Sequence, residues 1–297
     1  MVSGGVLIAC ALSLLLVSCG GGGGSDDDDT PVSDFVAVPG ATFDGTTAIT
    51  GSSVFIANRT VTIPNLLVCD HEVTQAEYQS VMGANPSNFS GTNKPVECVS
   101  WYDALVYCNK RSLADGRTPC YKINGKTNPS EWGTVPTSSN STWNSATCDF
   151  VANGYRLPTD AEWEYLARGG NLTNSGQTTY SGSNTIGDVA WYKVNAYDVG
   201  ESNPNYGTQQ VKTKNPNGKT LYDMSGNVYE WCWDWYDSNG ITASTPSTGA
   251  ASGSNRVLRG GCWLSNASCC SVSYRNYHSP FIRGNPLGFR VVCSRSE

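Results

Sequence analysis

The sequence predicts a loop-rich globular fold that mixes short strands with a few helices. The chain has 297 residues, which is enough to bury a core. It contains 9 Trp, 15 Tyr and 32 Gly, but only 15% of its residues are charged. Apolar runs are short and separated by Gly and polar turns, and only three segments carry strong helix start signals. Length alone leaves open one large domain or two small ones.

The N-terminus predicts export and lipid attachment. Residues 6–18, VLIACALSLLLVS, form an apolar run of signal-peptide length, which is short for a spanning helix. We therefore expect a lipoprotein signal peptide over residues 1–18. Leu16 to Cys19 match the lipobox of bacterial lipoproteins, in which the Cys is acylated and becomes the mature N-terminus. An ordinary secretory signal is the alternative, because no Lys or Arg precedes the apolar run.

Residues 19–34 are expected to be a flexible tether between the lipid anchor and the folded domain. Gly20 to Asp29 contain no apolar residue that could be buried, and four of their side chains are Asp. These four charges account for most of the net charge of −6, and no basic patch is present. The composition therefore excludes a nucleic-acid partner. A lipid anchor followed by this tether favours a protein displayed at the outer membrane and cell surface.

The folded domain is expected over residues 35–297. FVAVPGATF and TVTIPNLLV, near its start, predict short strands. Capping boxes predict helices that follow Thr74, Ser100 and Thr159, the first of which ends at Gly83. Residues 115–150 are rich in Ser, Thr and Asn and predict a long insertion, which a disulfide between Cys120 and Cys148 could close.

The cysteine and histidine content also favours an exported protein without a zinc site. Twelve Cys is a high number for a reducing compartment. His71 and His278 are the only histidines, and no CxxC spacing is present.

The C-terminal stretch from Arg256 to Val292 has structural ends and an irregular middle. Leu287 to Val292 predict a buried strand, and Trp263 is predicted to lie in the core. The large side chains between these ends follow neither a strand nor a helix period, which indicates either a loop that contacts a ligand or a loop that packs its aromatic residues into the core.

Several segments together resemble the formylglycine-generating (sulfatase-modifying) enzyme family. They are HEVTQAEYQSVMGANPSNF, RLPTDAEWEYLARGG, LYDMSGNVYEW, VLRGGCW and LGFRVV, and they stand in family order between about residues 35 and 293. The resemblance implies an α+β fold of C-type-lectin-like type, loop-rich with short strands and few helices.

The same resemblance argues against catalysis. The enzymes of the family oxidise a substrate cysteine with a pair of cysteines that hold copper, and soft thiolates suit Cu(I). In this sequence Ser265 stands in place of the first cysteine, whereas Cys270 stands in the second position. Cys262 and Cys269 stand at shifted positions, and a linear two-coordinate site tolerates little displacement. We therefore expect no copper oxidase activity and no required cofactor, and two scattered histidines exclude the iron site of sulfoxide-synthase relatives.

The resemblance also implies a structural calcium ion in LYDMSGNVYEW. The corresponding ligands are the carboxylates of Asp223 and Glu230 and the backbone carbonyls of Gly226 and Val228, and oxygen donors suit this hard cation. The alternative is that both acidic residues cap turns and pair with Arg side chains.

A second resemblance is to the variable proteins of diversity-generating retroelements, including a treponemal surface lipoprotein. In these family members, reverse transcription randomises adenines in a C-terminal coding segment, which cannot then yield Lys, Glu, Gln, Met or Trp from asparagine codons. None of those five residues occurs between Leu264 and Val292. The resemblance assigns variation to Cys262, Leu264, Ser265, Cys269, Cys270, Tyr274, Tyr277, His278, Ser279, Phe281, Ile282, Gly284 and Pro286.

The residues between these positions look fixed. They are Asn266, Ala267, Ser268, Val272, Arg275, Asn276, Pro280, Arg283 and Asn285. We therefore predict a monomeric, non-catalytic surface lipoprotein that binds a protein or other surface macromolecule through a variable region at about residues 256–292. A copper oxidase acting on cysteine in proteins and a fixed-specificity structural lipoprotein of the envelope are the alternatives.

Overall fold

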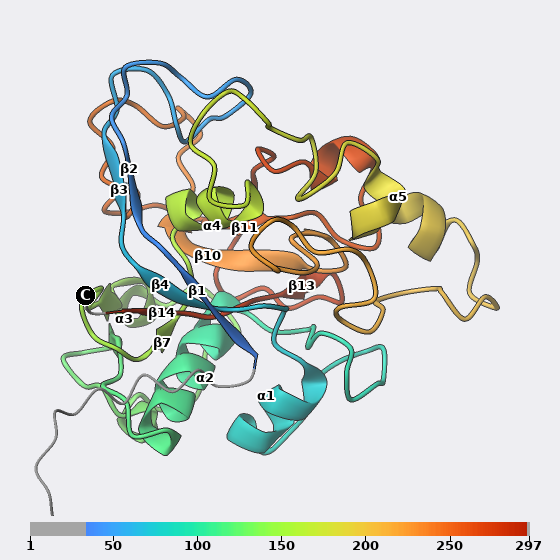
Figure 1. Ribbon diagram of the computed structural model, residues 1–297. Coiled ribbons are helices and arrows are strands. Elements are labelled where there is room, and N and C mark those ends of the chain that lie inside the picture. Colours follow the sequence, from blue (N-terminus) through green and yellow to red (C-terminus); the bar gives the residue numbers. More distant parts are fainter. Residues whose placement is uncertain (1–33, 296–297) are drawn as a thin grey trace, which may run out of the picture. The chain divides into compact units, whose positions relative to one another are not determined.

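Two four-stranded sheets organise the domain (Figure 1). The computed structural model describes residues 34–295. The predicted signal peptide, the lipidated Cys19 and nearly all of the tether lie outside these residues. The first sheet has the strand order β1-β4-β14-β7 and the second β12-β11-β10-β13. Neighbouring strands in them are antiparallel, except that β10 and β13 run parallel.

The strands are short and the helices few, which confirms the predicted α+β, loop-rich fold. In chain order the strands are β1 (Phe35–Val38), β2 (Ala41–Phe43), β3 (Val61–Ile63), β4 (Leu66–Cys69), β5 (Tyr121–Lys122), β6 (Thr147–Cys148), β7 (Tyr155–Arg156), β8 (Ala190–Trp191), β9 (Ser225–Gly226), β10 (Tyr229–Trp235), β11 (Arg256–Arg259), β12 (Asn276–His278), β13 (Leu287–Gly288) and β14 (Val292–Ser294). The helices are α1 (Gln75–Met82), α2 (Trp101–Ala114), α3 (Ser141–Asn144), α4 (Asp160–Ala167) and α5 (Ile186–Val189), with short helical turns at η1 (Pro129–Glu131), η2 (Lys193–Tyr197) and η3 (Ala267–Cys270).

The three predicted capping boxes are present. The side chains of Thr74, Ser100 and Thr159 accept hydrogen bonds from the backbone N–H three residues later, and the acidic residue there reaches back to the cap. The helix α1 ends, as predicted, at Gly83, whose φ of 82° places it in the left-handed conformation. Local sequence signals therefore fix where these helices begin.

The inner strands β10 and β11 of the second sheet are almost entirely buried, and helices cover the sheet from either side. The helix α2 lies on one side of β10 and α4 on the other (Figure 1). Trp231 and Leu258 pack in the same core cluster as α2, whereas Cys232 and Val257 pack in the cluster of α4. This alternation follows from the two-residue period of a strand.

The segment that follows the irregular C-terminal loop joins the two sheets. Residues 287–292 are buried, as predicted, but they do not form one strand. Leu287 and Gly288 pair with β10 of the second sheet, whereas Val292 pairs with β4 and β7 of the first. The chain therefore crosses from one sheet to the other at Phe289–Val291.

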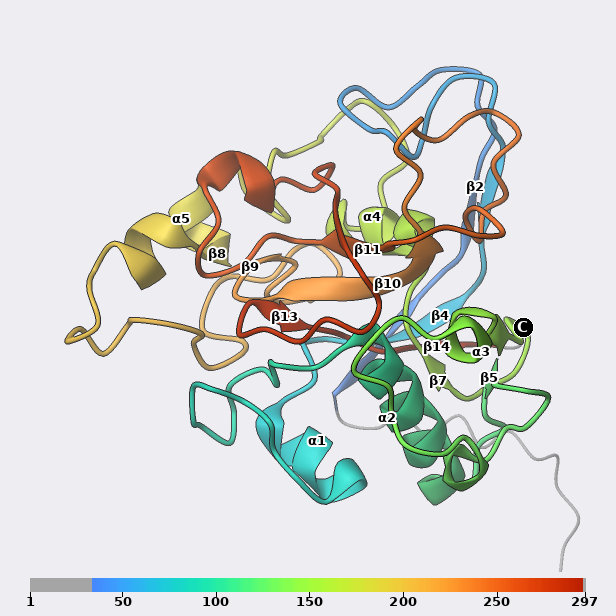
Figure 2. The ribbon, with the colours of Figure 1, turned by 180° about the vertical axis from the view of Figure 1, so that it is seen from behind.

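The insertion at residues 115–150 lies beside α2 (Figure 2). The side chain of Asn109 on α2 donates to the carbonyls of Tyr121 and Thr127, which ties the insertion to the helix. Cys120 directly precedes β5, and Cys148 lies in β6, which pairs with β5. Both are free thiols, so the disulfide that could close the insertion is absent. In the part of the chain that the structure describes, no helix is long and apolar enough to cross a membrane.

Candidate binding surface

The irregular C-terminal segment begins with a turn that only glycine allows. Gly260 and Gly261 have φ values of 88° and 77°. A Cβ on Gly261 would lie 2.6 Å from the sulfur of Cys270. The backbone therefore enters the segment directly over η3.

Buried and partly buried arginines hold the segment in place. The guanidinium of Arg259 donates to Asp160 at 2.6 Å and to the carbonyl of Tyr274 at 2.7 Å. Arg275 donates to the other oxygen of Asp160 at 2.7 Å, and Arg283 makes a bidentate pair with Asp103 at 2.7 and 2.9 Å. Charge-assisted bonds of this kind are strong and directional. The guanidinium groups of these arginines point inward, and their contacts with the scaffold hold the backbone of the segment in place.

Trp263 lies in the core, as predicted, and is 2% exposed. Its ring meets Phe89 and Tyr206 edge-on, with ring centroids 4.9 and 5.3 Å apart. Its indole N–H donates to the carbonyl of Asn285 at 3.2 Å. One aromatic anchor therefore ties the beginning of the segment to its end.

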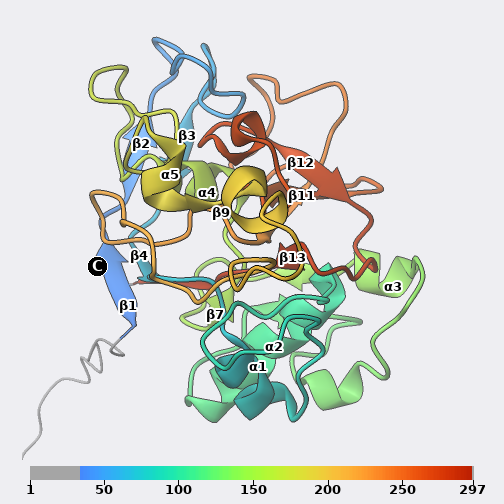
Figure 3. The same cartoon turned by 90° about the vertical axis from the view of Figure 1, so that its right-hand side faces the viewer.

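Most positions that the sequence assigns to variation reach the surface. Tyr277 and His278 are exposed on β12, the edge strand of the second sheet, which faces the viewer beside the loop in Figure 3. Tyr277 is 47% exposed and its ring stacks on Tyr236 at 4.2 Å. The partly exposed positions are Leu264, Cys269, Tyr274, Ser279, Phe281, Ile282, Gly284 and Pro286.

Three of the assigned positions, Cys262, Ser265 and Cys270, are buried. Their side chains offer no contact area in this structure and instead lie beneath the loop. Four apolar side chains show an intermediate behaviour, because one face packs against the core while the other remains exposed. These are Leu264, Tyr274, Phe281 and Ile282.

Ser265, at the position that the resemblance assigns to the first copper-binding cysteine, brings a hydroxyl beside the thiol of Cys262. The hydroxyl of Ser265 lies 3.3 Å from the sulfur of Cys262 and accepts a hydrogen bond from the backbone N–H of that residue. Burial raises the pKa of the Cys262 thiol to about 11 and also raises the pKa of Cys270. Burial therefore disfavours the thiolate form of both sulfurs, and Ser265 supplies no thiol at all.

The predicted calcium ligands lie around a concentration of buried negative charge. Glu72, Asp223 and Glu230 are buried, and Arg290 is the cation that pairs with Glu230, at 2.7 Å. Burial, followed by the charges of Asp223 and Glu230, raises the pKa of Glu72 well above its usual value. One arginine does not balance three ionised carboxylates, so the site favours either protonation of Glu72 or a divalent cation that would let all three ionise.

The donor atoms of this region partly fit a calcium ion. One carboxylate oxygen of Asp223 is buried and has no hydrogen-bond partner. Both oxygens of Glu230 accept hydrogen bonds from Arg290, and one also accepts from the indole of Trp163. Asp223 therefore offers a free oxygen, whereas Glu230 is already held by a guanidinium, as the alternative interpretation expected. The backbone carbonyls of Gly226 and Val228 would complete the ligand set.

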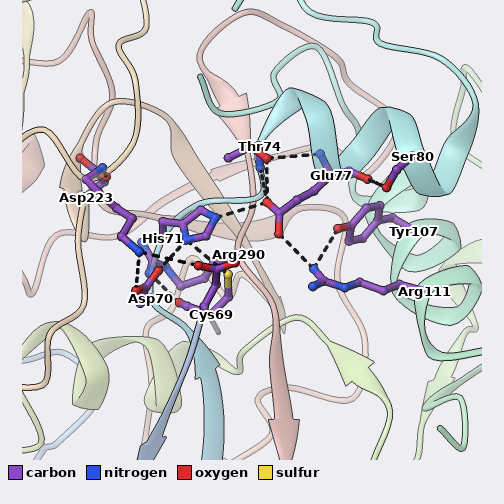
Figure 4. Close-up of polar contacts among 12 residues, drawn as sticks. Cys69, Asp70, His71, Thr74, Glu77, Ser80, Tyr107, Arg111, Asp223 and Arg290 are labelled. Carbon is purple, nitrogen blue, oxygen red and sulfur yellow. Dashed lines mark hydrogen bonds and ion pairs between the residues drawn. The ribbon is translucent and has the colours of Figure 1, made fainter. Parts of the chain in front are cut away.

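A polar cluster that the sequence did not reveal lies between β4 and α1 (Figure 4). In the described residues it is the one place where three His, Cys, Asp or Glu side chains bring ligand atoms within 4.8 Å of one another: Cys69, His71 and Glu77. Both ring nitrogens of His71 are already engaged, by Asp70 at 2.5 Å and by Glu77 at 3.3 Å.

The contacts of His71 favour an imidazolium in an ion network over a metal ligand. Burial alone would lower its pKa, but the hydrogen bonds to Asp70 and Glu77 raise it to about 12. Lys212 pairs with Asp70 at 2.7 Å, and Arg111 lies 3.4 Å from Glu77. Cys69, Asp70, His71 and Glu77 lie within nine residues of the sequence, whereas Lys212 and Arg111 come from distant parts of the chain. The sequence therefore contains the centre of the cluster but does not show the cations around it.

Comparisons with known proteins agree with this fold. The structure is similar to the solved structure of variable protein 1 of Treponema denticola, with a TM-score of 0.75 and 37% identity over 88% of this chain and 95% of that one. The sequence is 38% identical to the chaperone protein LppX of Paenibacillus barcinonensis over 90% of this chain and 91% of the relative. It is also 37% identical to the formylglycine-generating enzyme of Streptomyces coelicolor, over 50% of each chain.

The family comparison covers nearly all of the described domain. The model of the sulfatase-modifying factor enzyme 1-like domain matches residues 24–295. Together with the similarity to the treponemal variable protein, this match confirms the resemblances inferred from the sequence. The chain belongs to the formylglycine-generating (sulfatase-modifying) enzyme family.

Proposed function

We propose that this protein is a non-catalytic, surface-displayed lipoprotein that binds macromolecular ligands through its C-terminal loop, and that a retroelement diversifies this loop. The likeness to variable protein 1 of Treponema denticola supports the proposal. In this proposal a lipid on Cys19 anchors the chain to the outer membrane, the tether holds the domain away from it, and the domain acts as a monomer.

The observation that carries the proposal is that, within the C-terminal segment, one set of residues holds the backbone while another set reaches the surface. Fixed-looking residues such as Arg275 and Arg283 make ion pairs with the scaffold, and Pro280 and Val272 are buried. Most assigned variable positions are partly or fully exposed between them. Their side chains can therefore change without breaking the contacts that hold the backbone.

The exposed side chains suit recognition of a large partner. Tyr277, Tyr274 and Phe281 supply aromatic contact area at a small entropic cost, as in antibody loops, while His278 and Ser279 supply polar contacts. Cys262, Ser265 and Cys270 would act from beneath, by changing the shape of the loop.

Sequencing the gene in several isolates tests the diversification. We expect changes concentrated at the assigned positions between Cys262 and Pro286, together with a template repeat and a reverse transcriptase nearby. An unchanging segment without these genes would instead support the fixed-specificity envelope lipoprotein.

The oxidase alternative makes a different prediction. A titration with Cu(I), followed by incubation with a cysteine-containing peptide, should show neither stoichiometric binding at the loop nor oxidation of the peptide. Stoichiometric copper with turnover would overturn the non-catalytic assignment. Ser265 in place of the first cysteine leads us to expect neither, because a hydroxyl is a poor ligand for Cu(I).

We also propose that a calcium ion stabilises the domain at Asp223. The buried oxygen of Asp223 without a partner and the local excess of carboxylates support this proposal. Calcium would supply only charge compensation and rigidity there. Titration calorimetry with Ca²⁺ on wild type and on Asp223→Asn tests it.

A further inference from the structure

A long groove runs beside the insertion at residues 115–150, and none of the assigned variable positions lines it. Its larger part has a volume of about 700 Å³ and lies between β6, the end of β10 and the loop at residues 246–253. A second hollow of about 420 Å³ continues it toward Lys122, and Ser141, Ser145 and Thr147 line both. Volumes of this order are typical of ligand sites.

The groove contains a buried arginine without a carboxylate partner. Arg256 is 1% exposed, and its guanidinium carbon lies 3.7 and 3.4 Å from the ring centroids of Trp101 and Trp235. The buried Arg156, Arg259 and Arg290 each pair with a carboxylate, whereas the buried Arg59 uses three nitrogens to donate to backbone carbonyls. In the described part of the chain, Arg256 makes no such pair.

The hydrogen bonds of Arg256 leave part of its charge uncompensated. One terminal nitrogen donates to the carbonyl of Trp233 and the other to the carbonyl of Asn144 at a long 3.5 Å. Its Nε is buried and has no partner. The two indole rings offset part of the cost of burying this charge, but no anion does, so the guanidinium could still accept one.

The residues around the groove show which kind of anion would fit. Lys122 and Arg256 are the only charged residues that line its two parts, and no Asp or Glu does, although the chain carries a net charge of −6. Trp233 and Phe150 supply partly exposed aromatic rings. Hydroxyl and amide side chains line much of the rest: Ser141, Thr142, Asn144, Ser145, Thr147, Thr248 and Ser252.

We infer that this groove binds an acidic oligosaccharide. Indole rings pack against the flat apolar faces of sugar rings, hydroxyl and amide groups bond to sugar hydroxyls, and Arg256 would face a carboxylate of the sugar. The elongated shape suits several sugar units in a row. An extended peptide fits less well, because the strand edge beside the groove is already occupied where Trp235 bridges to Ala250.

This site would be constant while the C-terminal loop changes. None of the residues assigned to variation lines either part of the groove. The inference is therefore independent of the proposed diversification, and one can fail while the other holds.

A calorimetric titration of the full chain with a tetramer of hexuronic acid tests the inference. We expect saturable binding of the acidic tetramer and at least about tenfold weaker binding of the neutral hexose tetramer, since a charge contact in a partly enclosed site commonly contributes that factor. An acidic peptide of equal length and charge serves as the competing class of ligand.

Two matched surface variants separate a real site from general charge effects. Ser252→Glu places a carboxylate on the groove lining, and Ser254→Glu places one on an exposed residue that does not line it. We expect Ser252→Glu to weaken binding about tenfold and Ser254→Glu to change it little. Both residues are exposed, so neither change should affect folding.

Arg256→Met tests the buried cation directly, with thermal unfolding as the check on folding. Loss of binding in a folded variant supports the inference. Absence of binding by the wild type at millimolar tetramer, equal binding of the neutral sugar, tighter binding of the acidic peptide, or equal effects of Ser252→Glu and Ser254→Glu would each overturn it.

Discussion

The pair between Arg283 and Asp103 offers the sharpest test of how the loop is held. We expect Arg283→Met to lower the free energy of unfolding by about 2 kcal/mol, because a bidentate hydrogen bond to a charged group contributes about 1.5–3 kcal/mol. The pair is partly shielded, since 29% of the Arg283 side chain and 11% of the Asp103 side chain are exposed. After the change Asp103 still accepts hydrogen bonds from Ser100, so its carboxylate is not left without a partner. The expected loss of unfolding free energy therefore lies inside that range rather than at its top.

His278→Ala provides the matched control on the same loop. His278 is exposed and packs against no core residue, so we expect a change within about 0.5 kcal/mol. Urea denaturation measures both values, and hydrogen exchange reports whether the loop amides lose protection only in Arg283→Met. In the double variant Asp103→Asn, Arg283→Met, the two effects should be less than additive.

The reasoning would be refuted by either of two results. If His278→Ala destabilises the protein as much as Arg283→Met does, the loop is not tolerant at its exposed positions. If Arg283→Met leaves both stability and loop protection unchanged, the ion pair does not anchor the backbone.

Three further predictions follow from the site and its surroundings. Phe281→Ala should cost about 2 kcal/mol in urea denaturation, below the loss for a fully buried Phe, because one face of the ring packs on the core; a change near zero would contradict that packing. Calcium at 100 times its dissociation constant should stabilise the wild type by about 2.7 kcal/mol and Asp223→Asn by much less, and equal stabilisation of the two would exclude Asp223 as a ligand. His71→Gln should flatten the pH dependence of stability in acid. Burial alone would raise the pKa of Glu77, but its bonds and charge contact with His71 lower it from 4.5 to about 2, so that its contribution is present above pH 4.5 and is lost as the pH falls toward 2. On the alkaline side the contribution of His71 is complete below its usual pKa of 6.5 and is lost only as the pH approaches 12. Between pH 2 and 5 the contribution of Glu77 decides the outcome, and parallel stability curves of wild type and variant there would contradict the network.

The sequence predicted the parts of this molecule that depend on neighbours along the chain. Thr74, Ser100 and Thr159 begin their helices where the capping boxes placed them, since each cap involves residues three positions apart. The buried position of Trp263 followed from the motif around it.

The parts that depend on distant residues were not predictable in this way. Leu287 to Val292 read as one strand, because an apolar run does not show that its halves pair with different sheets. Burial of Ser265 beside Cys262 could not be read from a loop without periodicity. Glu230 was expected to hold calcium, and only the structure shows the guanidinium of Arg290 against both of its oxygens.

Because the chain crosses from β13 to β14, formation of the first sheet depends on where the C-terminal loop places the residues that follow it. Residues that follow the loop supply Val292, whose strand lies between β4 and β7 in the middle of the first sheet. A loop sequence that displaces Leu287 and Gly288 would also displace this inner strand, so the first sheet could not form. Folding itself would then act as a filter, since chains with incompatible loops would fail to fold before they reached a partner.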